Sequence, residues 1–252
     1  MIKKNQIRAL LKSIETGNAE AVAVVNEAKY IQHNPQTYEG SEGLAALFQR
    51  LSKTSPSVNI VRAFEDGEFV FAHTEYDFAN RNIGFEVFRF EDGRAVEHWD
   101  NIQKRLGPNG SGRSMVDGPT EAVDLELTES NRAFVRSFVE SVLIDGQLAR
   151  ITDFIDEHSY VEHNPQLGDS VCLLRSALEV EEGGDRHIDY HHVHRVLAEG
   201  SFVLSASEGT YGGAQSAFYD LFRLANGIVV EHWDTTEKIA PRSEWKNENG
   251  KF

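Results

Sequence analysis

The stretch Tyr30-Ile-Gln-His-Asn-Pro-Gln36 decides the fold, because it returns in the second half of the chain as Tyr160-Val-Glu-His-Asn-Pro-Gln166. A second stretch follows each copy: Phe88–Asp100 ends in Val-Glu-His-Trp-Asp, and so does Phe222–Asp234. Extended by four residues, the copies of this second stretch are identical at nine of seventeen aligned positions. Two motifs that recur in the same order indicate that a whole domain has been duplicated in tandem.

The composition is that of a globular protein and excludes several classes. A chain of 252 residues suits two domains, and 40% hydrophobic and 26% charged residues are ordinary globular values. We find no apolar run long enough to cross a membrane and no signal-peptide pattern after Met1, so we expect a cytoplasmic protein. The net charge of −15 argues against nucleic-acid binding, which needs clustered Lys and Arg. The single cysteine, Cys172, is interpreted as a packing residue.

Hydrophobic periodicity predicts the same order of elements in both halves. In the first half, apolar residues at helical spacing predict three helices, over residues 2–15, 18–28 and from 41 to just before Pro56. Two-residue alternation then predicts two hairpins, 58–78 and 84–103. Helices followed by a four-stranded antiparallel meander define an α+β domain.

The expected domain boundaries follow from the repeat and from composition. We assign residues 1–106 to the first domain, 107–127 to a Gly- and Pro-rich linker, and 128–252 to the second domain with its C-terminal tail. The tail from Pro241 onward has no counterpart in the first half. Because it carries Trp245 and Phe252, we expect it to pack against the body of the protein.

In both halves the paired motifs, Tyr-x-x-His-Asn-Pro and Phe-Arg-x-x-x-Gly-x-x-Val-Glu-His-Trp-Asp, resemble those of the SnoaL-like polyketide cyclases, a branch of the nuclear transport factor 2-like superfamily. The stretches Ser111–Thr120 and Pro241–Phe252 are similar to a bacterial subgroup of predicted SnoaL-like aldol-condensation enzymes. This resemblance implies two cone-shaped α+β barrels, each a curved antiparallel sheet on N-terminal helices with a pocket at its open end. It also implies an internal pseudo-dimer with two-fold symmetry. The substrate stays open, because the fold hosts enzymes of several classes and non-catalytic binders.

The Val-Glu-His-Trp-Asp motif supplies the predicted acid/base pair. On a strand, His98 and Asp100 share one face while Glu97 and Trp99 share the other. A carboxylate partly desolvated in an apolar cone is a usable base for a carbon acid, and an imidazole can donate to the developing enolate oxygen. We therefore predict a cofactor-free lyase or isomerase, of the aldol-condensation or cyclase type, acting on a small carbonyl compound. The alternative is that the motif is structural.

His33 and His73 complete the predicted catalytic set. His33 precedes Asn34 and Pro35 at an expected helix end, where it can turn into the mouth of the cone or else cap the helix. The counterpart of His73 in the second half is Ala206, so we expect the first domain to be the catalytic one. The predicted substrate-binding residues of the two halves are Tyr30, Asn34, Glu75, Trp99, His163, Asn164, His232 and Asp234.

Two other functions stay open. The first is a non-catalytic module that binds a small ligand or mediates dimerisation. The second is a metal-dependent enzyme built on histidines of the second half, with His192 and His194 meeting His163 and His232; His187 and His191 lie nearby in the sequence. Neither Cys nor the carboxylate spacing of a known metal motif accompanies these histidines, so we expect no metal and no cofactor.

Overall fold

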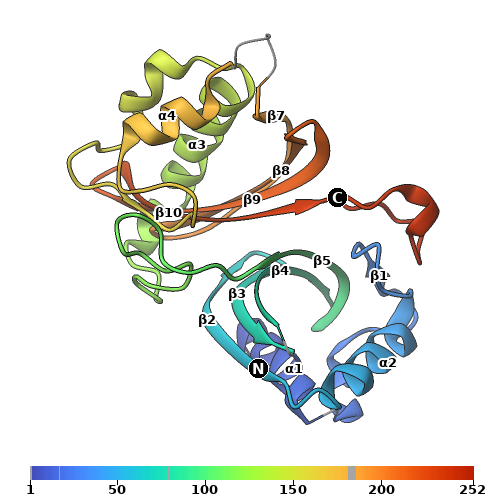
Figure 1. The fold of residues 1–252 in the computed structure, drawn as a ribbon. Helices are drawn as coiled ribbons and strands as arrows, with labels where there is room; N and C mark the ends of the chain where they lie inside the picture. Colours follow the sequence, from blue (N-terminus) through green and yellow to red (C-terminus); the bar gives the residue numbers. More distant parts are fainter. Residues whose placement is uncertain (1, 17, 79, 181–185) are drawn as a thin grey trace. The chain divides into compact units, whose positions relative to one another are not determined.

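The computed structural model describes residues 2–16, 18–78, 80–180 and 186–252 (Figure 1). The chain forms two compact units: unit 1 is Met1–Arg105 with Ala240–Phe252, and unit 2 is Leu106–Ile239. The expected pseudo-two-fold relation between the two halves stays a prediction.

Unit 1 is an α+β fold in which helices pack on one five-stranded sheet. Its helices are α1 (Lys3–Lys12) and α2 (Gly40–Ser52), with 3-10 turns at Ser13–Glu15 and Ala19–Val24. Its strands are β1 (Ile31–Gln32), β2 (Ser57–Asp66), β3 (Phe69–Asp77), β4 (Arg81–Glu91) and β5 (Arg94–Lys104). They run in the order β1-β5-β4-β3-β2, so the predicted meander gains a short parallel strand beside β5. The sheet stays open in the described part of the chain and closes no barrel.

Unit 2 repeats this topology. Its helices are α3 (Thr128–Phe138), which continues as a π-helical turn over Val139–Ile144, and α4 (Val171–Leu178), with 3-10 turns at Leu125–Leu127 and Leu148–Asp153. Its strands are β6 (Val161–Glu162), β7 (Ile188–Glu199), β8 (Phe202–Tyr211), β9 (Ala214–Ala225) and β10 (Ile228–Lys238). The strand order β6-β10-β9-β8-β7 matches that of unit 1 and fits a tandem duplication. None of the described helices is long and apolar enough to span a membrane.

Two tight hairpins set the register on which the rest of the sheet depends. Asp92 and Gly93 join β4 to β5 with φ values of 51° and 78°, and Asn226 and Gly227 join β9 to β10 with 53° and 77°. Both residues of a two-residue type I′ turn need positive φ, which Asp, Asn and Gly tolerate best. The turns therefore fix the pairing next to them, and a bulge between Arg89 and Phe90, like the one between Val229 and Glu231, then shifts it to the register of the site residues.

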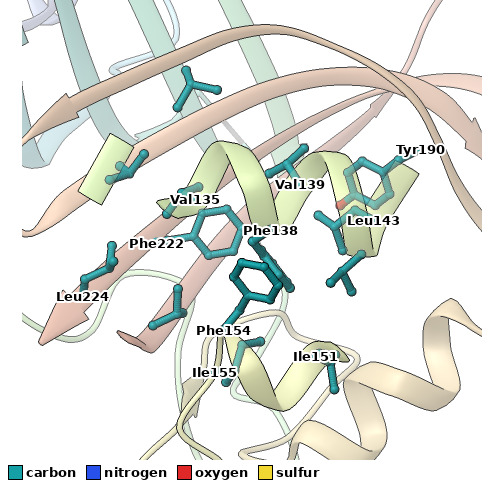
Figure 2. Close-up of a cluster of buried hydrophobic side chains, with 14 of the residues drawn as sticks. Val135, Phe138, Val139, Leu143, Ile151, Phe154, Ile155, Tyr190, Phe222 and Leu224 are labelled. Atoms are coloured by element: carbon teal, nitrogen blue, oxygen red, sulfur yellow. The ribbon is translucent and has the colours of Figure 1, made fainter. Parts of the chain in front are cut away.

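The core lies between each sheet and its helices. In unit 1, Ile7 and Leu10 of α1 pack in one buried cluster with Val70 and Phe88 of the sheet. In unit 2 (Figure 2), Phe138 of α3 contacts Phe222 of β9 edge to face, with ring centroids 5.6 Å apart. Fully burying one such aromatic side chain stabilises the fold by about 1.5–3 kcal/mol. We call the sheet face that meets the helices the inner face, and the opposite one the outer face.

The expected second helix, residues 18–28, is wrong beyond its first turns. A 3-10 turn covers Ala19–Val24, after which Val25 pairs with Ala95 in a parallel bridge. The chain then stays at the sheet edge, where Ile31 and Gln32 form β1 against β5. Backbone groups that pair with a sheet are not available to a helix. The first motif is therefore an edge strand hydrogen-bonded to the second motif, which explains why the two recur together.

The tail and the expected linker are both docked. Residues 240–252, which we grouped with the second domain, pack on unit 1, where Lys246 donates its backbone N–H to Pro35 O at 2.8 Å. Residues 106–127 pack as part of unit 2, where Asn109 donates to Glu162 O at 2.7 Å. In each unit, therefore, a segment packs against the His-Asn-Pro motif of that unit: the tail in unit 1, and residues 106–127 in unit 2.

Candidate functional site

His98 and Asp100 lie on the inner face of β5, as strand alternation predicts. The His98 ring stacks on Phe88 with centroids 4.3 Å apart, and Phe88 belongs to the core under the helices. The pairing of β3, β4 and β5 puts Ala72, Glu86 and Asp100 in one row across the sheet. Side chains in one row share a face, so Glu86 is an inner-face neighbour of the predicted pair.

The first site is a buried network built around His98. Its Nδ1 donates to Gln32 Oε1 at 3.0 Å, and its Nε2 lies 2.7 Å from Glu86 Oε2. The hydroxyl of Tyr76 donates to the other oxygen of Glu86 at 2.7 Å. All four side chains are buried. Both nitrogens of His98 are thus occupied, so our expectation that this imidazole donates to an enolate is wrong for this geometry.

Asp100 is held from two sides. Asn34 Nδ2 donates to Oδ2 at 2.6 Å, and Lys251 Nζ, from the C-terminal tail, lies 3.5 Å from Oδ1. The hydroxyl of Tyr30 is buried with no hydrogen-bond partner among the described residues. Burial, with the charges of Glu86 and Asp100 nearby, raises the pKa of Tyr30 well above its usual value. Tyr30 is therefore a neutral phenol beside these carboxylates.

The second site repeats the network with more negative charge. His232 Nδ1 lies 3.0 Å from Glu162 Oε1, where the first half has Gln32, and Nε2 lies 3.1 Å from Asp220 Oδ1. Burial opposes a charge on His232, but the carboxylates of Glu162 and Asp220 outweigh it and raise its pKa well above the usual value. Burial alone would raise the pKa of Glu162, but the charge of His232 and its hydrogen bond lower it. The ring is an imidazolium between two carboxylates.

Asp234, the counterpart of Asp100, has a different environment. Asn164 Nδ2 donates to Oδ2 at 2.8 Å, but Oδ1 is buried with no partner in the described part of the chain. Burial raises the pKa of Asp234 to about 7; the charges of Glu162 and Asp220 add to the rise, and His232 and Asn164 oppose it. At neutral pH this carboxyl group is divided between its two protonation states, as an efficient general base or acid requires.

Two hydroxyls face the same inner surface of unit 2. Ser205 pairs across β8 and β9 with Asp220, which pairs with Asp234, and Ser207 lies two residues further along β8. The Oγ atoms of both serines are buried without a partner in the described structure. Buried hydroxyls normally find partners, so these two unsatisfied groups, on the same sheet face as Asp234, are the kind of donors that a ligand oxygen would use.

A tyrosine donates to the central acid in both sites, but from different strands. Tyr76 of β3 donates to Glu86, whereas Tyr190 of β7 donates to Asp220 at 3.1 Å. Tyr190 pairs directly with Gly209, which replaces Tyr76 in the aligned β8. A Cβ on Gly209 would lie 1.9 Å from the backbone oxygen of Asp189. The second site therefore places its phenol on the neighbouring strand and has the same kind of contact with the acid.

Several predicted site residues lie away from these networks. His73 is on the outer face, where its Nδ1 lies 2.7 Å from Arg62 Nη1, and Glu75, on the same face, forms an ion pair with Arg105. Register explains this, since His73 pairs with Phe85 while the inner row contains Ala72 and Glu86. The expectation that His73 joins Asp100 and His98 at one substrate is therefore wrong.

His33 and Trp99 also belong to the outer side. The two rings stack 4.7 Å apart, and His33 Nε2 lies 2.9 Å from Glu97 Oε1. His163 stacks in the same way on Trp233. Each of these histidines follows the short parallel strand, where one further step along the chain turns the side chain to the other face. The residues that the structure brings together are Tyr30, Asn34, His98 and Asp100 in the first site, and Asn164, His232 and Asp234 in the second.

The histidines proposed as metal ligands do not converge. His192 and His194 lie together on β7 with ring centroids 4.7 Å apart, and His194 Nε2 faces Glu208 at 3.5 Å. His232 is held in the inner network, and His163 Nε2 lies 2.9 Å from Glu231 Oε1. A metal site that joins these four residues is therefore wrong.

Within the described residues, a different group has metal-ligand chemistry. Ligand atoms of Glu86, His98 and Asp100 all lie within 4.8 Å of one another. Both nitrogens of His98 already contact side-chain oxygens, and the Lys251 ammonium lies beside Asp100. A cation would have to displace an ammonium from one ligand and break the hydrogen bonds of another, so the donor set fits a metal poorly.

Sequence reasoning missed part of both networks. Glu86 and Asp220 stand two residues before Phe88 and Phe222, so extending the aligned motif by two positions would have shown an acid in both copies. The repeat aligns Gln32 with Glu162, but their difference in charge hid that both contact the histidine of the second motif. Lys251 gave no signal at all, because it lies at the far end of the chain from Asp100.

Residues 7–98 match the SnoaL-like domain family. No curated protein matches the chain. Among solved structures, TsrD from Streptomyces laurentii is 19% identical, with 39% of this chain and 86% of that chain covered and a TM-score of 0.35. IdmH from Streptomyces antibioticus, a suspected polyketide cyclase, is 16% identical, with coverages of 41% and 93% and a TM-score of 0.36.

Proposed function

Because residues 7–98 are a SnoaL-like domain, we propose that this chain catalyses proton transfer at a carbon next to a carbonyl group. The reaction is of the lyase or isomerase type, as in an aldol condensation or a ring closure. It uses no cofactor, and its bases are Asp234 in unit 2 and Asp100 in unit 1. The observation that carries the proposal is the state of Asp234, a carboxyl group with a pKa of about 7 whose Oδ1 is buried without a partner in the described structure.

The chemistry requires a base, a means to hold it and donors for the enolate oxygen. Asn164 holds one oxygen of Asp234, and the other has no partner in the described structure, so it is the oxygen that would take the proton from the substrate carbon. The imidazolium of His232, between Glu162 and Asp220, is a fixed positive charge near the carboxylate and lowers the cost of its ionised form. The unpaired hydroxyls of Ser205 and Ser207 are donors for the enolate oxygen.

We place the stronger base in unit 2, which reverses our expectation from the sequence. That expectation depended on His73, which lies on the outer face and cannot reach a substrate at Asp100. Asp100 is an ion-paired carboxylate beside Lys251, whereas Asp234 has no cation within a salt-bridge contact in the described structure. A base whose pKa is close to the working pH transfers protons most effectively.

The test is hydrogen exchange at the α-carbon of small ketones in D₂O, followed by NMR. Cyclohexanone and hydroxyacetone serve as probes, since enolisation is common to every reaction of the proposed class. We expect catalysed exchange in the native protein and, in an Asp100→Asn background that leaves unit 2 as the active site, a loss of about 10²–10⁴-fold when Asp234→Asn is added. Asn keeps an acceptor for Asn164, so folding is preserved. If exchange in the native protein equals the uncatalysed rate, or if the double variant Asp100→Asn/Asp234→Asn exchanges as fast as the native protein, the chain is instead a non-catalytic module that binds a small ligand.

A further inference from the structure

The C-terminal tail is anchored step by step along the first His-Asn-Pro motif. Asn247 Nδ2 donates to Asn34 O at 2.7 Å and to Thr37 O at 3.0 Å, and Asn249 Nδ2 donates to Gln32 O at 3.0 Å. His33 Nδ1 donates to Gly250 O at 3.1 Å. Carbonyl groups of the motif that the sheet leaves unpaired are thus satisfied by two asparagines of the tail. These contacts determine where the next residue of the tail lies.

That next residue is Lys251, whose side chain is buried. It is 2% exposed, and its Nζ lies 3.5 Å from Asp100 Oδ1, opposite the oxygen held by Asn34. Burying a lysine is costly, and a chain end that packed for shape alone would not need one. The burial of Lys251 therefore indicates that its ammonium has a role next to the carboxylate of Asp100.

Unit 2 provides a matched comparison in the same chain. In unit 2 the segment around Asn109 occupies the position that the tail has in unit 1. Asn109 Nδ2 donates to the carbonyl oxygens of Glu162 and Asn164, and His163 Nδ1 donates to Ser114 O at 2.7 Å. The residue after Ser114 is Met115, just as Lys251 follows Gly250. Met115 is likewise buried. The two caps are built alike but end in an ammonium in one unit and in a thioether in the other.

We propose that Lys251 binds the enolate oxygen in the first site, so that the tail supplies a catalytic residue to unit 1. The inference rests on the proposed function, since it assigns a role within the same proton transfer. Asp100 Oδ1 takes the proton from the carbon next to the carbonyl. The C–H electron pair becomes the C=C bond, and the π pair of the carbonyl moves to its oxygen. The negative charge therefore leaves Asp100 and appears on the enolate oxygen, and the ammonium follows it.

With this role for Lys251, the two sites stabilise the enolate in different ways. The first uses a carboxylate with a partner cation that stabilises the enolate, and the second uses a carboxyl group of raised basicity with neutral hydroxyl donors. A preorganised cation in a buried site has its largest effect where charge develops, and it needs no reorganisation during the step. The first site should therefore accept ketones whose enolates are poorly stabilised on their own.

The experiment uses the full chain with Asp234→Asn, so that exchange reports on the first site alone. In this background we compare Lys251→Met, Lys251→Arg and Asp100→Asn, with cyclohexanone as the probe. Lys251→Met copies Met115 and should lower kcat for α-proton exchange by about 10²–10³-fold with little change in KM. Lys251→Arg, which keeps the positive charge, should retain part of the kcat that Lys251→Met loses. The matched control is Lys246→Met, the same substitution on an exposed lysine of the same tail, whose Nζ lies over the ring of Tyr38; it should leave the rate unchanged.

The outcomes are distinguishable. If Asp100→Asn abolishes exchange while Lys251→Met does not change it, the role of Lys251 is refuted and the proposed function stands. If Lys251→Met raises the rate, the lysine blocks the site, and the inference is again refuted. If Asp100→Asn has no effect in this background, the proposed function fails for the first site. A lysine with only a structural role would alter the urea midpoint of unfolding but not the pH profile of kcat, which Lys251→Met should shift to higher pH.

Discussion

Replacing Asp234 by Asn should make the protein more stable at alkaline pH while it removes the proposed base. The folded-state pKa of about 7 lies above the ordinary value of 3.8. Above pH 3.8 the unfolded chain releases this proton, whereas the folded chain keeps it until about pH 7. The contribution to stability is therefore fully present at acidic pH and is lost as the pH rises through 7.

The magnitude follows from the same two values. One pH unit of differential proton binding corresponds to 1.36 kcal/mol, so wild-type protein should lose about 2–3 kcal/mol through Asp234 between pH 5 and pH 8. Asparagine does not titrate. Its carbonyl oxygen can accept from Asn164, and its amide can occupy the position of the unpaired Oδ1. The advantage of Asp234→Asn over wild type should therefore grow by about 2–3 kcal/mol over this interval.

The assay is urea unfolding of both proteins at pH 5 and pH 8, followed by circular dichroism. Asp100→Asn is the control, because the same substitution at the equivalent position leaves the buried Lys251 without its partner and should destabilise unit 1. An advantage of Asp234→Asn that stays constant or shrinks with pH would show that burial does not hold Asp234 in its neutral form. The assignment of Asp234 as a base of near-neutral pKa would then be withdrawn.

Four further outcomes are expected. Asp100→Asn should lower the free energy of unfolding by about 1–3 kcal/mol at pH 8, measured in the same urea titration, and a gain in stability would contradict the ion pair with Lys251. His232→Gln leaves Glu162 and Asp220 as buried carboxylates without their cation and should cost about 3–5 kcal/mol by urea unfolding at pH 7; a loss below 1 kcal/mol would count against the imidazolium. Met115→Lys should bring an ammonium to the second site, lower the pKa of Asp234 from about 7 and move the pH profile of ketone exchange toward acid, whereas an unmoved profile would mean that the two caps are not equivalent. Tyr76→Phe and Tyr190→Phe should cost similar amounts, about 1.5–3 kcal/mol each, because both remove a hydrogen bond to a buried acid, and a clear inequality would argue against the exchanged tyrosine positions.

The inner-face pairing of His98 with Asp100 was predictable because strand alternation is a local property. Side chains two residues apart on a strand share a face in any sheet, so the motif alone placed them together and placed Trp99 opposite. The hairpin turns were equally local, since Asp-Gly and Asn-Gly pairs favour type I′ geometry. Duplication was visible as identity between the two motifs and fits the shared strand order. Each of these inferences needed only neighbouring residues.

Register and burial had to come from the tertiary structure. The sequence showed His73 on a strand, but whether it shares a face with Asp100 depends on pairing across two further strands, and a shift of one residue reverses the answer. Gln32 and Glu86 reach His98 from an edge strand and a neighbouring strand. No local sequence pattern predicts contacts between residues of three different strands.

The sequence by itself determined the duplicated α+β fold, the two recurring motifs and the face on which His98 and Asp100 lie, because these depend on composition, periodicity and alternation. The tertiary structure alone decided that equivalent aspartates differ. Asp100 meets Lys251 from the end of the chain, whereas Asp234 is half-buried, has no cation contact in the described structure and has a pKa of about 7. The physical reason is that the charge state of a buried carboxyl group is set by desolvation and by charges within a few ångströms, which chain segments far apart in sequence supply.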